Sequence, residues 1–241
     1  MIHRSLQFGV KKCESLVEVI MAIFVVAMGS GVATSLIVSA LQSNAFSRDN
    51  LIALNLAVEG VEAMREIRDA NWLRFSYDKT TCWNMRPEVV DCLDIAAKPI
   101  AQANGFSTGG YTVDLNLTPN KYAWNLPAAP FATKLNLDSS GNDDYQLYYY
   151  DLDTTKDSDG DTKPANDHDL MASQSISLPT GVAQTGASRF YRMVTVDYIP
   201  GGVTTDQEMN VTSTVQWRTQ GVKHEVVLST KLTNYQKVKV K

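Results

Sequence analysis

Residues 16–41, LVEVIMAIFVVAMGSGVATSLIVSAL, form an apolar run of 26 residues in which Glu18 is the only charged side chain. About 20 apolar residues suffice for a helix to span a bilayer, so this run predicts a helix in a membrane or in an equally apolar environment. A carboxylate inside such a segment costs on the order of 2 to 3 kcal/mol on insertion scales unless it is paired. Glu18 is therefore a candidate functional residue that needs a partner.

The segment before this run is basic, with Arg4, Lys11 and Lys12 and no acidic residue in positions 1–13. By the positive-inside rule, this predicts a cytoplasmic N-terminus and an extracytoplasmic body. The apolar run is too long for the roughly 7–15-residue core of a cleaved secretory signal, and no small-residue cleavage site follows it cleanly. We therefore expect a single-pass precursor in the inner, cytoplasmic membrane.

Helical periodicity continues beyond the run. Within residues 51–73, apolar side chains recur at helical spacing, at Leu54, Val58, Val61, Met64 and Ile67. No proline occurs before residue 87, so nothing in the sequence forces a break. The pattern predicts one helix over about 15–70, apolar all round in its first half and amphipathic in its second half.

Farther along the chain, the sequence pattern changes to one that is typical of β-strands. Five segments of alternating or aromatic-rich sequence predict strands, at 111–117, 145–152, 190–199, 208–218 and 225–232. The last three are joined by short turns and fit an antiparallel meander. The predicted fold class is α+β, with a long N-terminal helix packed on an antiparallel sheet head at 74–241. An irregular insert is expected between about 71 and 190.

The amino-acid composition of the chain argues against some classes of function. The net charge is −4 with a pI of about 5.4, and the basic leader makes the remaining body more acidic still. An acidic body argues against nucleic acid as the main ligand of the head, although a role in DNA uptake stays open. The three histidines are scattered, and no phosphate-binding loop or hydrolase motif is present. We therefore expect a protein that is not an enzyme.

Two cysteines lie in the exported part of the chain. Cys82 and Cys92 are ten residues apart, in a compartment where a disulfide can persist. The spacing favours a bridge, and the alternative is two unrelated thiols in a loop. Two thiols without nearby histidines do not make a zinc site.

An acidic loop over 151–169 suggests a possible cation site. Asp157, Asp159 and Asp161 alternate around Gly160, and carboxylate oxygens in such a turn suit Ca²⁺. The EF-hand pattern fails, because the sixth and twelfth positions counted from Asp157 are Thr and His instead of Gly and Glu. The alternative is a solvated acidic loop.

The segment KKCESLVEVI, residues 11–20, resembles the processing signal of type IV prepilins and type II secretion pseudopilins. The stretches AVEGVEAMREIRDANWL and VTSTVQWRTQGVKHEVVLSTKLTNY resemble minor pilins of the pilus-modification type. This resemblance implies a leader at 1–13, cleavage between Cys13 and Glu14 by a prepilin peptidase, a methylation motif, and a filament-forming helix at 14–73.

Two residues depart from the family pattern. Cys13 stands where the family has glycine before the cut, and Glu14 replaces the first mature phenylalanine. A cut after Gly9 is an alternative, but it would move Glu18 from the fifth to the ninth mature position and break the register.

The resemblance implies a partner for Glu18. Cleavage exposes a new α-amino group, which on one subunit can neutralise Glu18 of a neighbour when the helices pack together. The alternative is that Glu18 reaches the headgroups. The implied protein is a minor or tip subunit of a type IV filament, with other pilin subunits as partners. The competing hypothesis is a membrane-anchored extracellular binding domain that never assembles.

Overall fold

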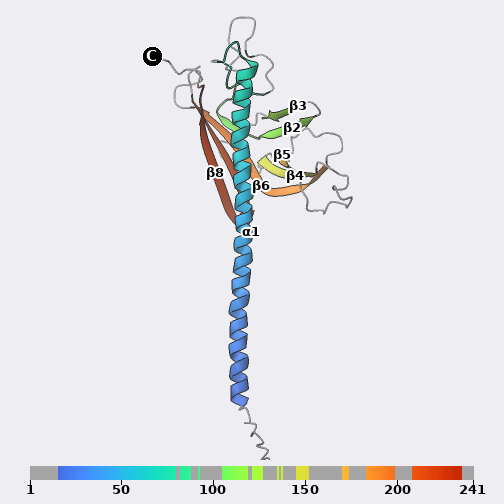
Figure 1. Ribbon diagram of the computed structural model, residues 1–241, viewed down its shortest axis with the longest axis vertical. Coiled ribbons are helices and arrows are strands. Elements are labelled where there is room, and N and C mark those ends of the chain that lie inside the picture. Colours follow the sequence, from blue (N-terminus) through green and yellow to red (C-terminus); the bar gives the residue numbers. More distant parts are fainter. Residues whose placement is uncertain are drawn as a thin grey trace, which may run out of the picture. The chain divides into compact units, whose positions relative to one another are not determined.

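We describe a computed structural model of the chain. It describes residues 16–79, 82–87, 92, 105–118, 121–126, 135, 137, 145–151, 170–173, 183–198 and 208–234. The elements are α1 (Leu16–Arg74), β1 (Gly109–Tyr111), β2 (Asp114–Thr118), β3 (Lys121–Asn125), β4 (Gln146–Asp151), β5 (Leu170–Ser173), β6 (Ala183–Tyr198), β7 (Met209–Thr219) and β8 (Val222–Leu232) (Figure 1). The chain divides into two compact units, Met1–Asp49 and Asn50–Lys241.

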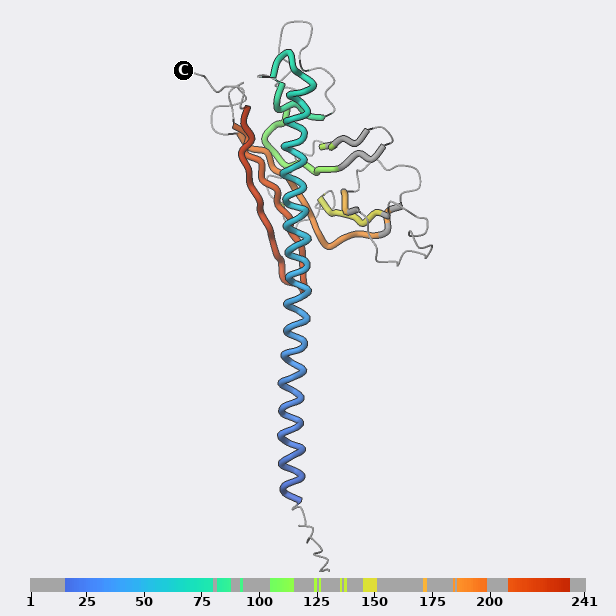
Figure 2. Tube along the Cα trace, in the orientation of Figure 1, coloured from blue at the N-terminus to red at the C-terminus, as the bar shows by residue number. Residues whose placement is uncertain are grey.

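The first unit contains the apolar part of α1. Every residue over 16–48 is exposed, so the large apolar side chains of this stretch lie on the surface of the described part of the chain. By length and composition, α1 can cross a membrane. The prediction of one continuous helix is confirmed, because α1 runs without interruption through 59 residues (Figure 2).

The second unit is built on an antiparallel sheet in the order β5-β4-β6-β7-β8, with β1 paired to β6 as well. Its last three strands, β6, β7 and β8, form the predicted meander. The α+β class is therefore confirmed. β6 is longer than expected, at 16 residues, because its first part pairs with β4 and its second part with β7.

The insert between the helix and the meander is more regular than predicted. The sequence predicted a largely irregular segment here, but five strands, β1 to β5, form within it. The single strand expected over 111–117 is wrong in detail. β1 joins the large sheet, whereas β2 pairs with β3 in a separate two-stranded sheet. The partner of β1 is β6, which lies far along the chain, and local alternation cannot show this pairing.

The helical residues of the second unit cover one face of β6 and β7. Two buried clusters lie there, one around Ala53, Leu56 and Trp217, the other around Met64 and Val194. Among the predicted stripe, Val61, Met64 and Ile67 are buried as expected. Leu54 and Val58 share the same helical spacing, but they are 41% and 40% exposed and lie outside the core.

The rotation of the helix follows from its small residues. A Cβ atom at Gly60 would lie 2.6 Å from Ser213 Oγ and 3.0 Å from Val194 Cγ2, so the backbone of α1 approaches the sheet here as closely as glycine permits. Ala57 and Ala53 are fully buried one and two turns earlier, respectively. These positions bring the helix backbone onto the sheet, which turns Leu54 and Val58 outward.

A disulfide fixes the loop after the helix. Cys82 and Cys92 are bonded, with Cα atoms 5.8 Å apart, and both are fully buried beside Phe75 and Met85. The side chain of Asn71 in the last turn of α1 donates to the carbonyl oxygens of Trp83 and Met85, at 3.2 and 2.7 Å. The end of the helix and the disulfide loop are thus held together.

Candidate functional site

The candidate assembly residue Glu18 lies in the first turn of α1 and is exposed. A negative charge at a helix N-terminus interacts favourably with the helix dipole. Within the described residues, Glu18 forms no hydrogen bond or ion pair. Its neighbours along the chain, such as Leu16 and Ile20, are apolar. Any group that neutralises it in an apolar medium must therefore come from outside the described part of the chain.

The other predicted site residues are not described. Cys13 and Glu14, at the expected cleavage position, lie outside the described residues, as do Asp157, Asp159 and Asp161 of the acidic loop. Among the described residues, no group of three or more His, Cys, Asp or Glu side chains could hold a metal ion. The calcium site therefore stays a prediction.

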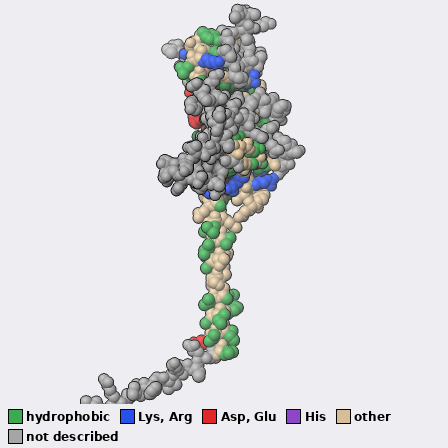
Figure 3. Space-filling model, turned by 90° about the vertical axis from the view of Figure 1, so that its right-hand side faces the viewer, with side chains coloured by type: hydrophobic (Ala, Val, Ile, Leu, Met, Phe, Trp, Pro, Cys, Tyr) green, Lys and Arg blue, Asp and Glu red, His purple; other side chains and the backbone are tan. Residues whose placement is uncertain are grey.

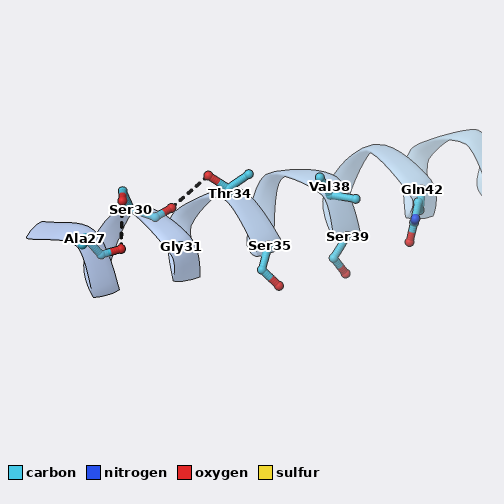
Figure 4. Close-up of a pocket in the computed structure, with 8 residues that line it drawn as sticks. All are labelled: Ala27, Ser30, Gly31, Thr34, Ser35, Val38, Ser39 and Gln42. Atoms are coloured by element: carbon cyan, nitrogen blue, oxygen red, sulfur yellow. Dashed lines mark hydrogen bonds between the residues drawn. The ribbon is translucent and has the colours of Figure 1, made fainter.

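One face of the apolar helix carries small and polar side chains. Figure 4 shows them in a line along α1: Ala27, Ser30, Gly31, Thr34, Ser35, Val38, Ser39 and Gln42. Ser30 Oγ donates to the Ala27 carbonyl oxygen and Thr34 Oγ1 to that of Ser30, each at 2.9 Å. Hydroxyl groups satisfied by their own helix are compatible with an apolar medium, and small residues four apart allow close helix contact.

The second part of the helix is anchored by a buried arginine that the sequence reasoning missed. Arg192 of β6 is 1% exposed in its side chain, and its Nη1 lies 3.1 Å from Glu59 Oε1 of α1. Arg192 Nη1 also donates to the Leu56 carbonyl oxygen at 3.4 Å, and Nη2 donates to that of Val113 at 2.6 Å. One side chain thus connects the helix, β6 and the segment between β1 and β2.

A signal for Arg192 was present in the sequence. In FYRMVTV, it shares the phase of Phe190, Val194 and Val196, which all point to the core. A charged residue on the inward phase of a strand must be paired when it is buried.

Further polar contacts tie α1 to two more strands. Arg65 Nη2 donates to Thr230 Oγ1 of β8 at 3.1 Å, and Trp124 Nε1 of β3 donates to Glu66 Oε2 at 2.6 Å. Glu66 and Trp124 also border a small cleft of about 160 Å³ near the end of the helix, and Arg74 and Pro87 line it as well. Arg74 Nη1 donates to the Pro87 carbonyl oxygen at 3.3 Å. Both charged groups of this cleft therefore already bond within the protein.

A partly buried tyrosine holds the segment that precedes β1 in place. Tyr198 of β6 donates its hydroxyl to the Phe106 carbonyl oxygen at 2.7 Å and accepts from Asn84 Nδ2 at 2.9 Å. Burial raises the pKa of Tyr198 to about 12, and the hydrogen bond from Asn84 opposes this shift in part. The phenol is therefore neutral at physiological pH, and it connects β6 to both the disulfide loop and the segment before β1.

Comparisons of the chain with protein-family models, with curated proteins and with solved structures found no match. The fold and the described side chains therefore define a structural class of protein, without naming a family. The chain has one N-terminal helix that can cross a membrane, continuous with a helix buried on an antiparallel sheet.

Proposed function

We propose that this chain is a structural subunit of a type IV filament, either a pilus or a related secretion filament, and that it has no catalytic role. The observation that carries the proposal is the position of Glu18. It is the only charge in an otherwise apolar, exposed helical stretch (Figure 3), and it is the fifth residue after the proposed cut. In this proposal, the membrane holds the precursor and neighbouring helices replace the lipid after assembly.

Several features support the proposal. The exposed apolar surface of residues 16–41 must be covered, since soluble monomers rarely expose apolar patches of this extent. The line of small residues from Ala27 to Gln42 offers a neighbouring helix a close approach. An amine made by cleavage after Cys13 would give Glu18 of a neighbour its neutralising partner. The sheet head would then project from the filament surface as a minor or tip subunit.

The deciding experiment is an intact-mass measurement of the protein purified from its native host. We expect a mass that has lost residues 1–13 and that starts at Glu14, with a further methyl group on the new amine. An intact N-terminus would contradict the proposal and favour a membrane-anchored binding domain that does not assemble. A mass that starts at residue 10 would place Glu18 in the ninth position and would remove the pairing argument.

A further inference from the structure

The strand β8 lies at the margin of the large sheet, and among the described residues it has a strand neighbour on one side only (Figure 1). It pairs with β7 over all 11 of its residues, without a bulge and without a proline. Such a long, regular edge presents a row of backbone N–H and C=O groups that can bond to another strand. Natural proteins usually shorten, bend, cover or charge such an edge, so the side chains of β8 decide what it accepts.

The turn before β8 determines which of its backbone groups face outward. Gln220 and Gly221 both have positive φ values, of 53° and 81°, which is typical of a tight type I′ hairpin turn. In such a turn the flanking pair, Thr219 and Val222, exchanges backbone hydrogen bonds, and hydrogen-bonded pairs then alternate along the ladder. The even-numbered residues of β8 therefore bond to β7, and the odd-numbered residues direct their backbone groups to the free edge.

The odd-numbered side chains of β8 lie on the face of the sheet that α1 does not cover, and all of them are exposed: Lys223, Glu225, Val227, Ser229 and Lys231. Glu225 forms no hydrogen bond or ion pair within the described part of the chain. Lys231 lies 3.3 Å from Glu208 in a pair whose side chains are 63% and 45% exposed, so its charge stays accessible to a partner. The free edge thus carries one acid between two lysines.

The even-numbered side chains continue the core to the same edge. Val226 and Leu228 are partly buried and pack against the cluster of Ala53 and Trp217 under α1. Apolar side chains of a further strand, placed beside them, would bury more of their surface. The edge therefore combines free backbone groups with a charge pattern on one face and apolar side chains on the other.

The charge pattern matches a second copy of the same strand. Because residues 225 and 231 are each three positions from Leu228, antiparallel pairing about a two-fold axis at Leu228 places Glu225 of each copy opposite Lys231 of the other. An axis at Val227 would place Lys223 opposite Lys231, and an axis at Glu225 would place two carboxylates together. Opposite charges on neighbouring strands are favourable and like charges are unfavourable, so the axis at Leu228 is preferred.

The pairing also fixes how the two heads approach each other. Ala53 packs in one cluster with Val226, and Arg65 donates to Thr230, so the helix and β8 run in the same direction within the second unit. In an antiparallel pair, Asn50, where the chain enters this unit, lies at opposite ends in the two copies. Such a pair suits two chains that enter from opposite directions, in contrast to two neighbours that enter side by side.

We propose that the free edge of β8 binds β8 of a second copy of this chain, in an antiparallel pair centred on Leu228 with a contact between Glu225 and Lys231 on each side. The backbone hydrogen bonds supply the attraction, and the charges select the register and reject unrelated strands. The partner is a second copy that enters from the opposite direction. This inference goes beyond the proposed function and does not require filament assembly.

The test uses the full chain in detergent, prepared with and without an affinity tag. A tagged parent chain should capture an untagged one. Glu225→Lys places two lysines opposite each other on both sides of the pair, and Lys231→Glu places two glutamates there, so each variant should capture itself about ten-fold less than the parent does. A mixture of the two variants restores one acid and one base at each contact and should reach the parent level.

Lys223→Glu is the matched control, since it makes the same change of charge on the same face of the same strand as Lys231→Glu. Position 223 lies opposite Thr233 of the partner in the proposed register, so this variant should capture itself as the parent does. Recovery in the mixture also shows that both charge-reversed variants are folded.

Three outcomes would overturn the inference. Parent chains may not capture one another at all. Capture that Glu225→Lys leaves unchanged would assign the association to the exposed apolar residues over 16–41 instead of β8. Weak capture by each variant without recovery in the mixture would exclude the register centred on Leu228. The filament proposal would stand in each case, because it depends on the mass of the mature chain and on Glu18.

Discussion

Arg192 of β6 and Glu59 of α1 form an ion pair, with Nη1 3.1 Å from Oε1, in which the guanidinium is buried and the carboxylate is about one-third exposed. Arg192 also donates hydrogen bonds to the carbonyl oxygens of Leu56 and Val113, so its side chain links β6 to α1 and to the segment between β1 and β2. The pair joins the helix to the sheet.

Glu59→Gln should destabilise the head by about 2 kcal/mol, since it leaves a buried guanidinium without its counter-charge. Urea unfolding of the full chain in detergent, followed by tryptophan fluorescence, measures this loss. Glu62→Gln is the matched control three residues later. It breaks an exposed pair with Arg65 and should cost no more than about 0.5 kcal/mol. Equal losses in the two variants would show that Arg192 does not depend on Glu59.

Gly60→Ala should lower stability, although alanine is a better helix former by about 1 kcal/mol. The added Cβ would clash with Ser213 Oγ, and such overpacking typically costs about 1 to 3 kcal/mol. Ser213→Ala in the same chain should recover part of the loss in an unfolding experiment. Gly29→Ala meets no atom within 4 Å and should leave the head unaffected. A Gly60→Ala variant as stable as the parent would contradict the close approach.

Tyr198 should make the head sensitive to alkaline pH. The pKa of Tyr198 in the folded state, about 12, lies above the unfolded value of 10.0. Its contribution to the stability of the folded head is therefore complete below pH 10 and is lost as the pH rises through 12. The loss should reach on the order of 2 kcal/mol. The free energy of unfolding, measured between pH 9 and about 12, should decline less steeply in Tyr198→Phe than in the parent. Tyr77→Phe, at an exposed tyrosine, should keep the decline of the parent.

Glu18→Ala should abolish incorporation into filaments and leave membrane insertion intact, because insertion becomes easier when the charge is removed. Immunoblots of sheared filaments and of membranes measure the two properties separately. Glu62→Ala removes an exposed acid from the amphipathic half of the same helix and should assemble as the parent does. Normal assembly of Glu18→Ala would count against the pairing with a neighbouring α-amine.

Much of the fold could be predicted from local patterns. The uninterrupted apolar and helical periodicity from Leu16 onward predicted α1, and alternation near the C-terminus predicted β6, β7 and β8. The division of this segment between the large sheet and the β2–β3 hairpin was not predicted, because β1 pairs with the distant strand β6, which local alternation does not reveal. The inward phase of Arg192 was visible in the sequence, but its three partners come from distant segments.

By itself, the sequence determined the length of the helix, its apolar first half and the single charge at Glu18, because these depend on residues that are neighbours along the chain. Only the tertiary structure decided which side of the helix is buried. Leu54 and Val58 fit the helical period, yet Ala53, Ala57 and Gly60 face the sheet, since only small side chains allow the backbone to approach so closely. The contacts of Arg192 with Leu56, Glu59 and Val113 likewise exist only in the tertiary structure, because these residues lie far from Arg192 in the chain.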